Sequence, residues 1–254
     1  MHNPIRFPLL LVVLTFFALL LSARIGVFFR KKRHHLEEVE SHDLDLVVAA
    51  VLTLLALIIG FSFSMATDRY NQRKNYEEAE ANAIGTEYVR ADLLPTADAA
   101  RVRTLLKEYL DERVLFYQTL DQHEFEQINA RTAQLQTELW SAVHALPPAQ
   151  QTPVVALAVS GMNDVLNSQG YTQAAWWNRI PVGAWILMLS VAICSNVLIG
   201  YGTRRDAGGM HLIVLPLVLC IAFFLIADID TPQRGIIRVR PQNLISLAQS
   251  LNAH

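Results

Sequence analysis

The imidazole and carboxylate side chains that could bind a metal ion gather in one short segment of the sequence. They are His34, His35, Glu37, Glu38, Glu40, His42 and Asp43. A metal site needs ligands that converge on one point in space, and a charged segment between two apolar helices usually faces water. We therefore expect no metal site in this segment and no cofactor in the protein.

The sequence contains no motif of a known catalytic mechanism. A phosphate-binding glycine loop, an H-E-x-x-H pair and a nucleophile motif are all absent. Gly60-Phe61-Ser62 has part of the pattern of a nucleophile elbow, but Ser64 stands where that pattern needs its second glycine. We expect that the protein is not an enzyme, since an enzyme would need a polar cleft built from residues that no motif marks.

The most informative spacing lies in an apolar stretch around Gly60. One line of small or hydroxyl side chains repeats every three or four residues, as on one face of a helix: Ala49, Thr53, Ala56, Gly60 and Ser64. Small side chains allow helices to pack closely in lipid. An overlapping line contains Thr53, Leu57 and Phe61 at intervals of four. If several copies of this helix surrounded one axis, these three positions would form stacked rings, and apolar rings can close a pore by excluding water.

Four apolar stretches contain or flank these residues. They cover 7–29, 44–66, 181–201 and 210–227, and each is long enough for a helix to cross roughly 30 Å of hydrocarbon. The basic run 30–33 follows the first stretch, so we interpret that stretch as a retained anchor and not as a signal peptide. The sequence thus predicts an integral membrane protein. Its net charge of -2 gives no reason to expect nucleic acid as a partner.

The polar segment between the second and third stretches is predicted to be helical throughout. The second apolar helix should continue through Asp68–Arg90, which contains no proline, and end at Leu94-Pro95. Thr96 or Asp98 is well placed to cap the next helix. Apolar residues close to the 3.6-residue period then predict three helices, within about 96–120, 122–146 and 150–169.

The predicted fold is all-α, with four transmembrane helices in two hairpins and a helical extramembrane domain inserted between the hairpins. We expect the first hairpin in 1–66, the helical domain in 67–180, the second hairpin in 181–228 and a C-terminal tail in 229–254. Basic residues near the span ends do not assign the side of the helical domain. Asn196, in the middle of the third stretch, needs a partner in hydrocarbon, and we expect a neighbouring helix to provide it.

Two sets of motifs resemble known membrane families. Gly60-Phe61, followed by Asp68-Arg69-Tyr70-Asn71-Gln72, resembles the end of the second membrane helix in the bestrophin chloride channels. A further resemblance, over most of the chain, is to an uncharacterised bacterial family described as bestrophin-like. Its hallmarks appear in 78–86, 90–95, 228–232 and 234–235, with these motif residues: Asn82, Gly85, Arg90, Asp92, Pro95, Asp228, Asp230, Arg234 and Gly235.

The resemblance to bestrophins implies a pentamer with a central pore. By the register of Gly60-Phe61, the apolar neck of such a pore falls on Thr53, Leu57 and Phe61. Only Phe61 keeps the aromatic side chain that the neck favours, so the constriction here is expected to be wider or wetter, and the resemblance does not fix anion selectivity.

Bestrophins also carry a calcium-binding acidic run after their fourth helix, at a place comparable to Asp228 and Asp230. Two carboxylates fall short of the six to eight oxygen ligands that calcium takes. We therefore expect the two aspartates to act as caps or to pair with Arg234 or Arg238.

These observations favour passive ion conduction, with anions preferred, by a homo-oligomer in a bacterial inner membrane. The partners would be the lipid bilayer, other copies of the chain and inorganic anions. A second hypothesis is a non-conducting membrane scaffold or sensor whose helical domain binds a partner, in which case the line of small residues serves packing alone. Two observations distinguish the hypotheses: the number of subunits, and whether the second apolar helices face an axial pore.

Overall fold

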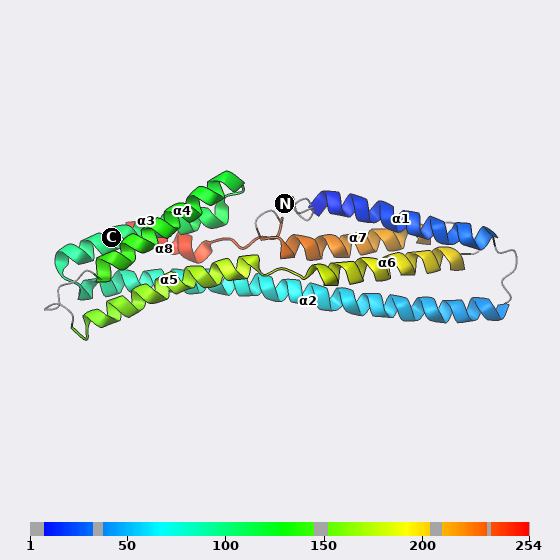
Figure 1. Ribbon diagram of the computed structural model, residues 1–254, viewed down its shortest axis with the longest axis horizontal. Helices are drawn as coiled ribbons and strands as arrows, with labels where there is room; N and C mark the ends of the chain where they lie inside the picture. The colour runs from blue at the N-terminus through cyan, green and yellow to red at the C-terminus, as the bar shows by residue number, and fades with distance from the viewer. Residues whose placement is uncertain (1–7, 33–37, 145–151, 204–209, 233–234, 254) are drawn as a thin grey trace. The chain divides into compact units, whose positions relative to one another are not determined.

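The computed structural model describes residues 8–32, 38–144, 152–203, 210–232 and 235–253. Within these ranges the regular elements are helices (Figure 1). In chain order they are α1 (Pro8–Lys32), α2 (Glu38–Arg90), a short 3-10 helix (Ala91–Leu93), α3 (Thr96–Gln118), α4 (Gln122–His144), α5 (Val155–Trp177), α6 (Val182–Gly202), α7 (His211–Asp230) and α8 (Gln242–Asn252). The prediction of an all-α fold is confirmed.

Four helices, α1, α2, α6 and α7, contain stretches that are long and apolar enough to cross a membrane. They correspond to the four stretches found in the sequence, so the prediction of four membrane-spanning helices is confirmed. Large apolar side chains such as Phe17, Phe28, Ile186 and Leu217 are exposed on them. A surface of this kind is stable against lipid and not against water, so this is an integral membrane protein.

The chain folds as two compact units. The first, called here the membrane unit, consists of Met1–Asp68 and Arg179–Ile237, and the second, called the helical unit, consists of Arg69–Asn178 and Arg238–His254. The long helix α2 therefore contributes its first part to one unit and its remaining part to the other. The segment expected as a separate tail, 229–254, is likewise divided, because α8 packs within the helical unit.

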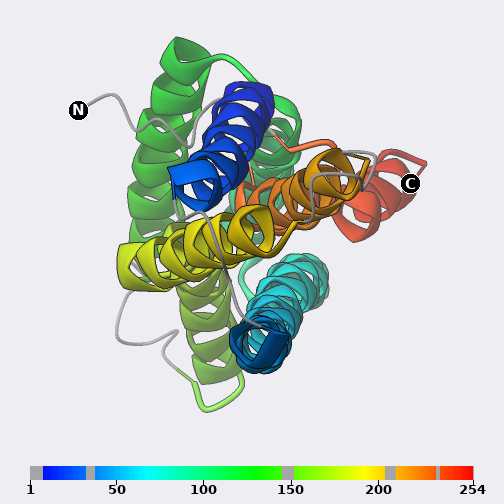
Figure 2. The same ribbon diagram turned by 90° about the vertical axis from the view of Figure 1, so that its right-hand side faces the viewer.

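Within the membrane unit, α1, α6 and α7 lie side by side (Figure 2). The closest approach is between α1 and α6, at Gly26 and Gly200. A Cβ atom added to Gly26 would lie 2.1 Å from the carbonyl oxygen of Val197, and one added to Gly200 would lie 2.0 Å from the carbonyl oxygen of Ala23. Any side chain at either position would push the two helices apart, so these glycines bring the backbones into contact.

The C-terminal end of α6 is satisfied by a side chain of α1. Arg30, at the end of α1, donates to the carbonyl oxygens of Tyr201 (3.2 Å) and Gly202 (2.6 Å). These carbonyls are among the last of α6 and have no partner within their own helix.

Asn196, in the middle of α6, donates from its amide to the carbonyl of Ala192, 2.8 Å away on the same helix. The expectation of a bond to a neighbouring helix is therefore wrong, because the carbonyl four residues earlier is already within reach.

The helical unit has an apolar core formed by the periodic residues of α3, α4 and α5. Val102, Leu106, Leu135, Leu139 and Met162 are all fully buried, as the 3.6-residue period predicts. Four aromatic rings pack together at one end of this core: Phe116, Tyr117, Phe125 and Trp176, with centroid separations of 4.5 to 6.3 Å.

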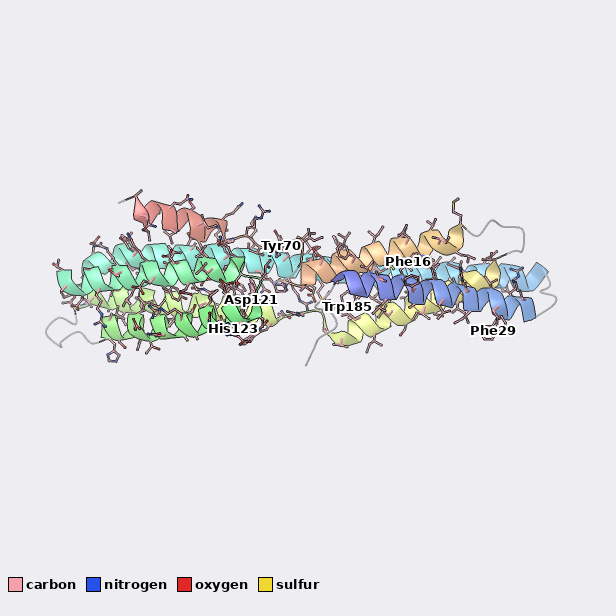
Figure 3. The ribbon with its side chains drawn as sticks, turned by 90° about the horizontal axis from the view of Figure 1, so that it is seen from above. Phe16, Phe29, Tyr70, Asp121, His123 and Trp185 are labelled. Atoms are coloured by element: carbon pink, nitrogen blue, oxygen red, sulfur yellow. The ribbon has the colours of Figure 1, made fainter. Side chains whose placement is uncertain are left out.

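The ends of α3 and α5 differ from the predictions, and α4 has a cap that was not predicted. α3 begins at Thr96, after Pro95, and neither Thr96 nor Asp98 caps it through a side chain, so that prediction was wrong. α4 has a side-chain cap, because Asp121 Oδ1 accepts the backbone N–H groups of His123 (2.7 Å) and Glu124 (3.0 Å) (Figure 3). α5 runs from Val155 to Trp177, eight residues beyond the predicted end at Gln169.

Candidate functional site

The three residues singled out on α2 lie on one exposed face of the membrane unit. Leu57 is 54% exposed and Phe61 is 65% exposed, and Thr53 is exposed as well. The Thr53 hydroxyl donates to the carbonyl of Ala49 at 2.8 Å. Its donor is therefore used within the helix.

The opposite face of the same stretch is buried. Leu55, Ser62 and Ala66 have exposed fractions of 1%, 5% and 0%. With about 100° of rotation per residue, these positions lie close to 180° around the helix from Thr53. The membrane part of α2 thus has one face packed in its own chain and another that the chain leaves open.

The line of small residues belongs to the open face. Ala49, Thr53, Ala56, Gly60 and Ser64 are all exposed, and a Cβ atom added to Gly60 would meet nothing within 4 Å. The small side chains therefore do not serve packing between helices of one chain. That role falls to Gly26 and Gly200, which the sequence analysis did not single out.

The other part of α2, in the helical unit, carries a row of buried charges. Arg73, Glu77, Glu80 and Glu87 have exposed fractions of 1% or less, and Ile84 completes the row at helical spacing. Sequence reasoning missed this row. Its signal was the interval of three and four residues, which places the charged side chains on the same face as an isoleucine.

Two residues of the row hold the neighbouring helix ends. Arg73 donates from Nε to the carbonyl of Ala175 (3.2 Å) and from Nη2 to that of Asn178 (3.3 Å), at the C-terminal end of α5. Glu77 accepts the N–H groups of Asn243 (2.9 Å) and Leu244 (3.0 Å) at the start of α8. A cation at a helix C-terminus and a carboxylate at a helix N-terminus both stabilise the helix dipole and satisfy groups without a partner in the helix.

The third residue of the row forms a fully buried ion pair. Glu80 accepts a bond of 2.5 Å from Arg113 Nε and one of 3.1 Å from the Thr172 hydroxyl, and both charged side chains are 0% exposed. Burial lowers the pKa of Arg113, but the Glu80 carboxylate outweighs it and keeps that pKa above its ordinary value. Burial, with the nearby Glu80 charge, raises the pKa of the Tyr109 and Tyr117 hydroxyls. The tyrosines therefore stay neutral, and the pair carries the charge of this core.

The motif residues at the end of α2 have structural contacts in the helical unit. A Cβ atom on Gly85 would lie 3.1 Å from Leu247 Cδ1, so this glycine makes room for α8. Asp92 forms an ion pair with Arg103. Pro95 precedes α3, and its carbonyl accepts the N–H of Ala99 at 2.8 Å. Asn82 is exposed and Arg69 is half-buried.

The acidic motif lies at the C-terminal end of α7 in the membrane unit. Asp228 accepts the backbone N–H groups of Ile236 (2.7 Å) and Ile237 (2.8 Å), and Asp230 accepts that of Ile180 with both oxygens (3.0 and 3.2 Å). A Cβ atom on Gly235 would lie 2.4 Å from the Asp228 carbonyl. The two aspartates thus accept backbone amides of residues outside helices and do not cap a helix as expected. Arg234, one of the two expected ion-pair partners, lies outside the described residues.

Within the described part of the chain, no group of three or more histidine, cysteine or acidic side chains could hold a metal ion. His34, His35 and Glu37 lie outside the described residues, as do the side chains of Glu38, Glu40 and His42.

Comparison with known proteins identifies the family and the fold. A family model, the bestrophin-like domain, matches residues 9–244. Among solved structures, a variant of a bacterial bestrophin homologue from Klebsiella pneumoniae superimposes with a TM-score of 0.68 at 12% identity, over 95% of this chain and 98% of that one. Another structure of a bacterial bestrophin homologue from Klebsiella pneumoniae, solved by zinc anomalous phasing, gives 0.65 at 13% identity, over 94% and 95%. No curated protein matches the sequence.

Because the identity to these solved structures is only 12 to 13%, the superposition shows that the chains share a fold. The family model extends from the second residue of α1 into α8 and includes the open face of α2, the buried row and the acidic loop. The chain therefore belongs to the bestrophin-like family of membrane proteins.

Proposed function

We propose that the protein is a passive channel for anions, built from several copies of the chain in a bacterial inner membrane. Copies of α2 surround a shared axis and turn Thr53, Leu57 and Phe61 toward it. The observation that carries this proposal is the open face of α2, where small and apolar side chains are exposed opposite a buried face. The bestrophins that the family resembles are chloride channels with a neck on this helix, and five subunits are the expected number.

The proposed neck has a layered chemistry. Phe61 and Leu57 form apolar rings, which resist ions by keeping water out of a narrow passage. Thr53 forms a ring of methyl groups and internally bonded hydroxyls. The small residues beside them, Gly60 and Ser64, allow adjacent copies of α2 to approach closely. The segments 1–66 and 181–228 would form the channel wall, and 67–180 a helical domain outside the membrane.

The test is chloride flux into proteoliposomes containing the purified protein. We expect Phe61→Ala to raise the flux several-fold, because it removes the largest apolar side chain of the proposed neck and so widens its narrowest point. Phe17→Ala is the matched control, since Phe17 is 63% exposed on α1 and has no part in the proposed neck. Flux that is equal in wild type, Phe61→Ala and Leu57→Ala would contradict the neck, and no flux in any of them would favour a non-conducting scaffold or sensor.

A further inference from the structure

The fourth residue of the buried row, Glu87, differs from the other three. Its side chain is 0% exposed, yet neither carboxyl oxygen has a hydrogen-bond partner among the residues that the structure describes. Arg73, Glu77 and Glu80 each have at least two such bonds. A buried charge without hydrogen bonds is unstable unless the group becomes neutral.

Glu87 lies directly against the backbone of α5. A Cβ atom on Gly161 would be 2.0 Å from Glu87 Oε2 and 2.5 Å from Arg90 Nη1. The missing side chain at Gly161, which is itself buried, thus provides the space that the carboxyl group occupies. Glu87 is thus one of the α2 side chains that contact α5, beside Arg73 and Glu80.

Two charged groups face the carboxyl, and they act in opposite directions. Burial raises the pKa of Glu87 to about 8, the Arg90 guanidinium on α2 lowers it, and the Asp164 carboxylate on α5 raises it further. The ordinary pKa of this side chain is 4.5. At a pH between 4.5 and about 8, Glu87 binds a proton while α5 is packed on α2, and it releases the proton when this contact opens and the carboxyl is hydrated.

We propose that Glu87 is a proton-binding site that couples pH to the packing of α5 on α2. The contact is tightest when the carboxyl is neutral. It loosens as the pH rises, because a carboxylate then faces Gly161 without a donor. Because the pKa of Glu87 is higher in the closed contact than in the opened one, the closed contact loses stability progressively from about pH 5 to about pH 8. Above about pH 8, the pKa of the closed contact, no further stability is lost.

The test is hydrogen exchange of the first half of α5, measured by mass spectrometry on the full-length protein in detergent from about pH 5 to about pH 10. At each pH the wild-type rate is divided by the rate of Glu87→Gln, so that the intrinsic pH dependence of exchange cancels. We expect this ratio to rise by up to about tenfold per pH unit below pH 8 and then to level off. A ratio that stays constant over the range would overturn the proposal.

Two further variants keep the test decisive. Glu78→Gln, a change at an exposed neighbour on α2, should leave the wild-type profile unaltered. Asp164→Asn alters only an exposed side chain and removes the charge that raises the pKa of Glu87, so the profile should level off at a lower pH. This variant can be compared with wild type even where Glu87→Gln does not fold. An unchanged profile in Asp164→Asn, or a profile abolished by Glu78→Gln, would contradict the proposal.

Discussion

The two parts of α2 differ in which side chains they expose and which they bury. In the membrane unit, its open face exposes Leu57, Phe61 and a line of small residues, and its buried face is apolar or small. In the helical unit, the same helix buries Arg73, Glu77 and Glu80 and satisfies them with bonds to other helices. One part leaves contacts open to lipid or to other copies, whereas the other pairs three of its four buried charges within the chain and leaves Glu87 without a hydrogen bond to any described residue.

This difference separates residues for assembly from residues for folding. A substitution on the open face has no partner in its own chain to lose, so it should change stability little and change assembly or flux instead. A substitution at Arg73, Glu77 or Glu80 removes one member of a satisfied polar contact, and the remaining member then stays buried without that partner. Stability measurements on matched pairs of variants test this separation.

The largest effect is expected at the buried ion pair of the helical unit. Arg113→Met would leave Glu80 buried without its cation, and losing one partner of such a pair costs about 3 to 5 kcal/mol. Arg103→Met breaks the more exposed pair with Asp92, whose side chains are 31% and 66% exposed, and should cost no more than about 1 kcal/mol. Denaturant unfolding of both variants in detergent measures the difference, and similar losses would break the comparison.

A smaller effect is expected from alanine in place of glycine in the membrane unit. Gly200→Ala places a methyl group against the backbone of α1 and should cost about 1 to 3 kcal/mol by overpacking. Gly60→Ala meets open space and should change the stability by about 0.5 kcal/mol or less. The two thermal transitions in detergent give the comparison directly. Equal destabilisation would mean that Gly60 is packed, either within its own chain or against another copy.

The smallest effect is expected where α2 holds α8. Glu77→Gln keeps the one oxygen that accepts both backbone N–H groups, but it loses the acceptor of the Asn243 side-chain amide and the charge at the start of α8, which should cost about 1 kcal/mol. The C-terminal segment should then be cleaved faster by a protease in limited digestion. Glu78→Gln, at the exposed neighbouring position, is the control. Equal cleavage of the two variants would show that the Glu77 carboxylate does not hold α8.

Several parts of the fold were predictable because their signals are local. The apolar lengths gave the membrane helices, and Leu94-Pro95 marked the end of the long helix that the structure finds at Arg90. The neck assignment to Thr53, Leu57 and Phe61 stays a prediction, because it concerns contacts between copies of the chain.

Other features were missed because they depend on segments far apart in the sequence. The pair Gly26 and Gly200 lies in two apolar stretches that give no sign of which helices meet. The buried row was hidden because charges on a polar helix ordinarily face water. Only the positions of Arg113 and Thr172 on other helices show that Glu80 lies in a core.

The most direct test of the central claim is thiol cross-linking on the open face of α2. In a background with Cys194 and Cys220 replaced by serine, Leu57→Cys is treated in native membranes with a short bis-maleimide. We predict covalent dimers at this position and none for Leu21→Cys, a residue of similar exposure on α1. Absence of dimers at Leu57→Cys, or equal yields at the two positions, would contradict an axis shared by copies of α2.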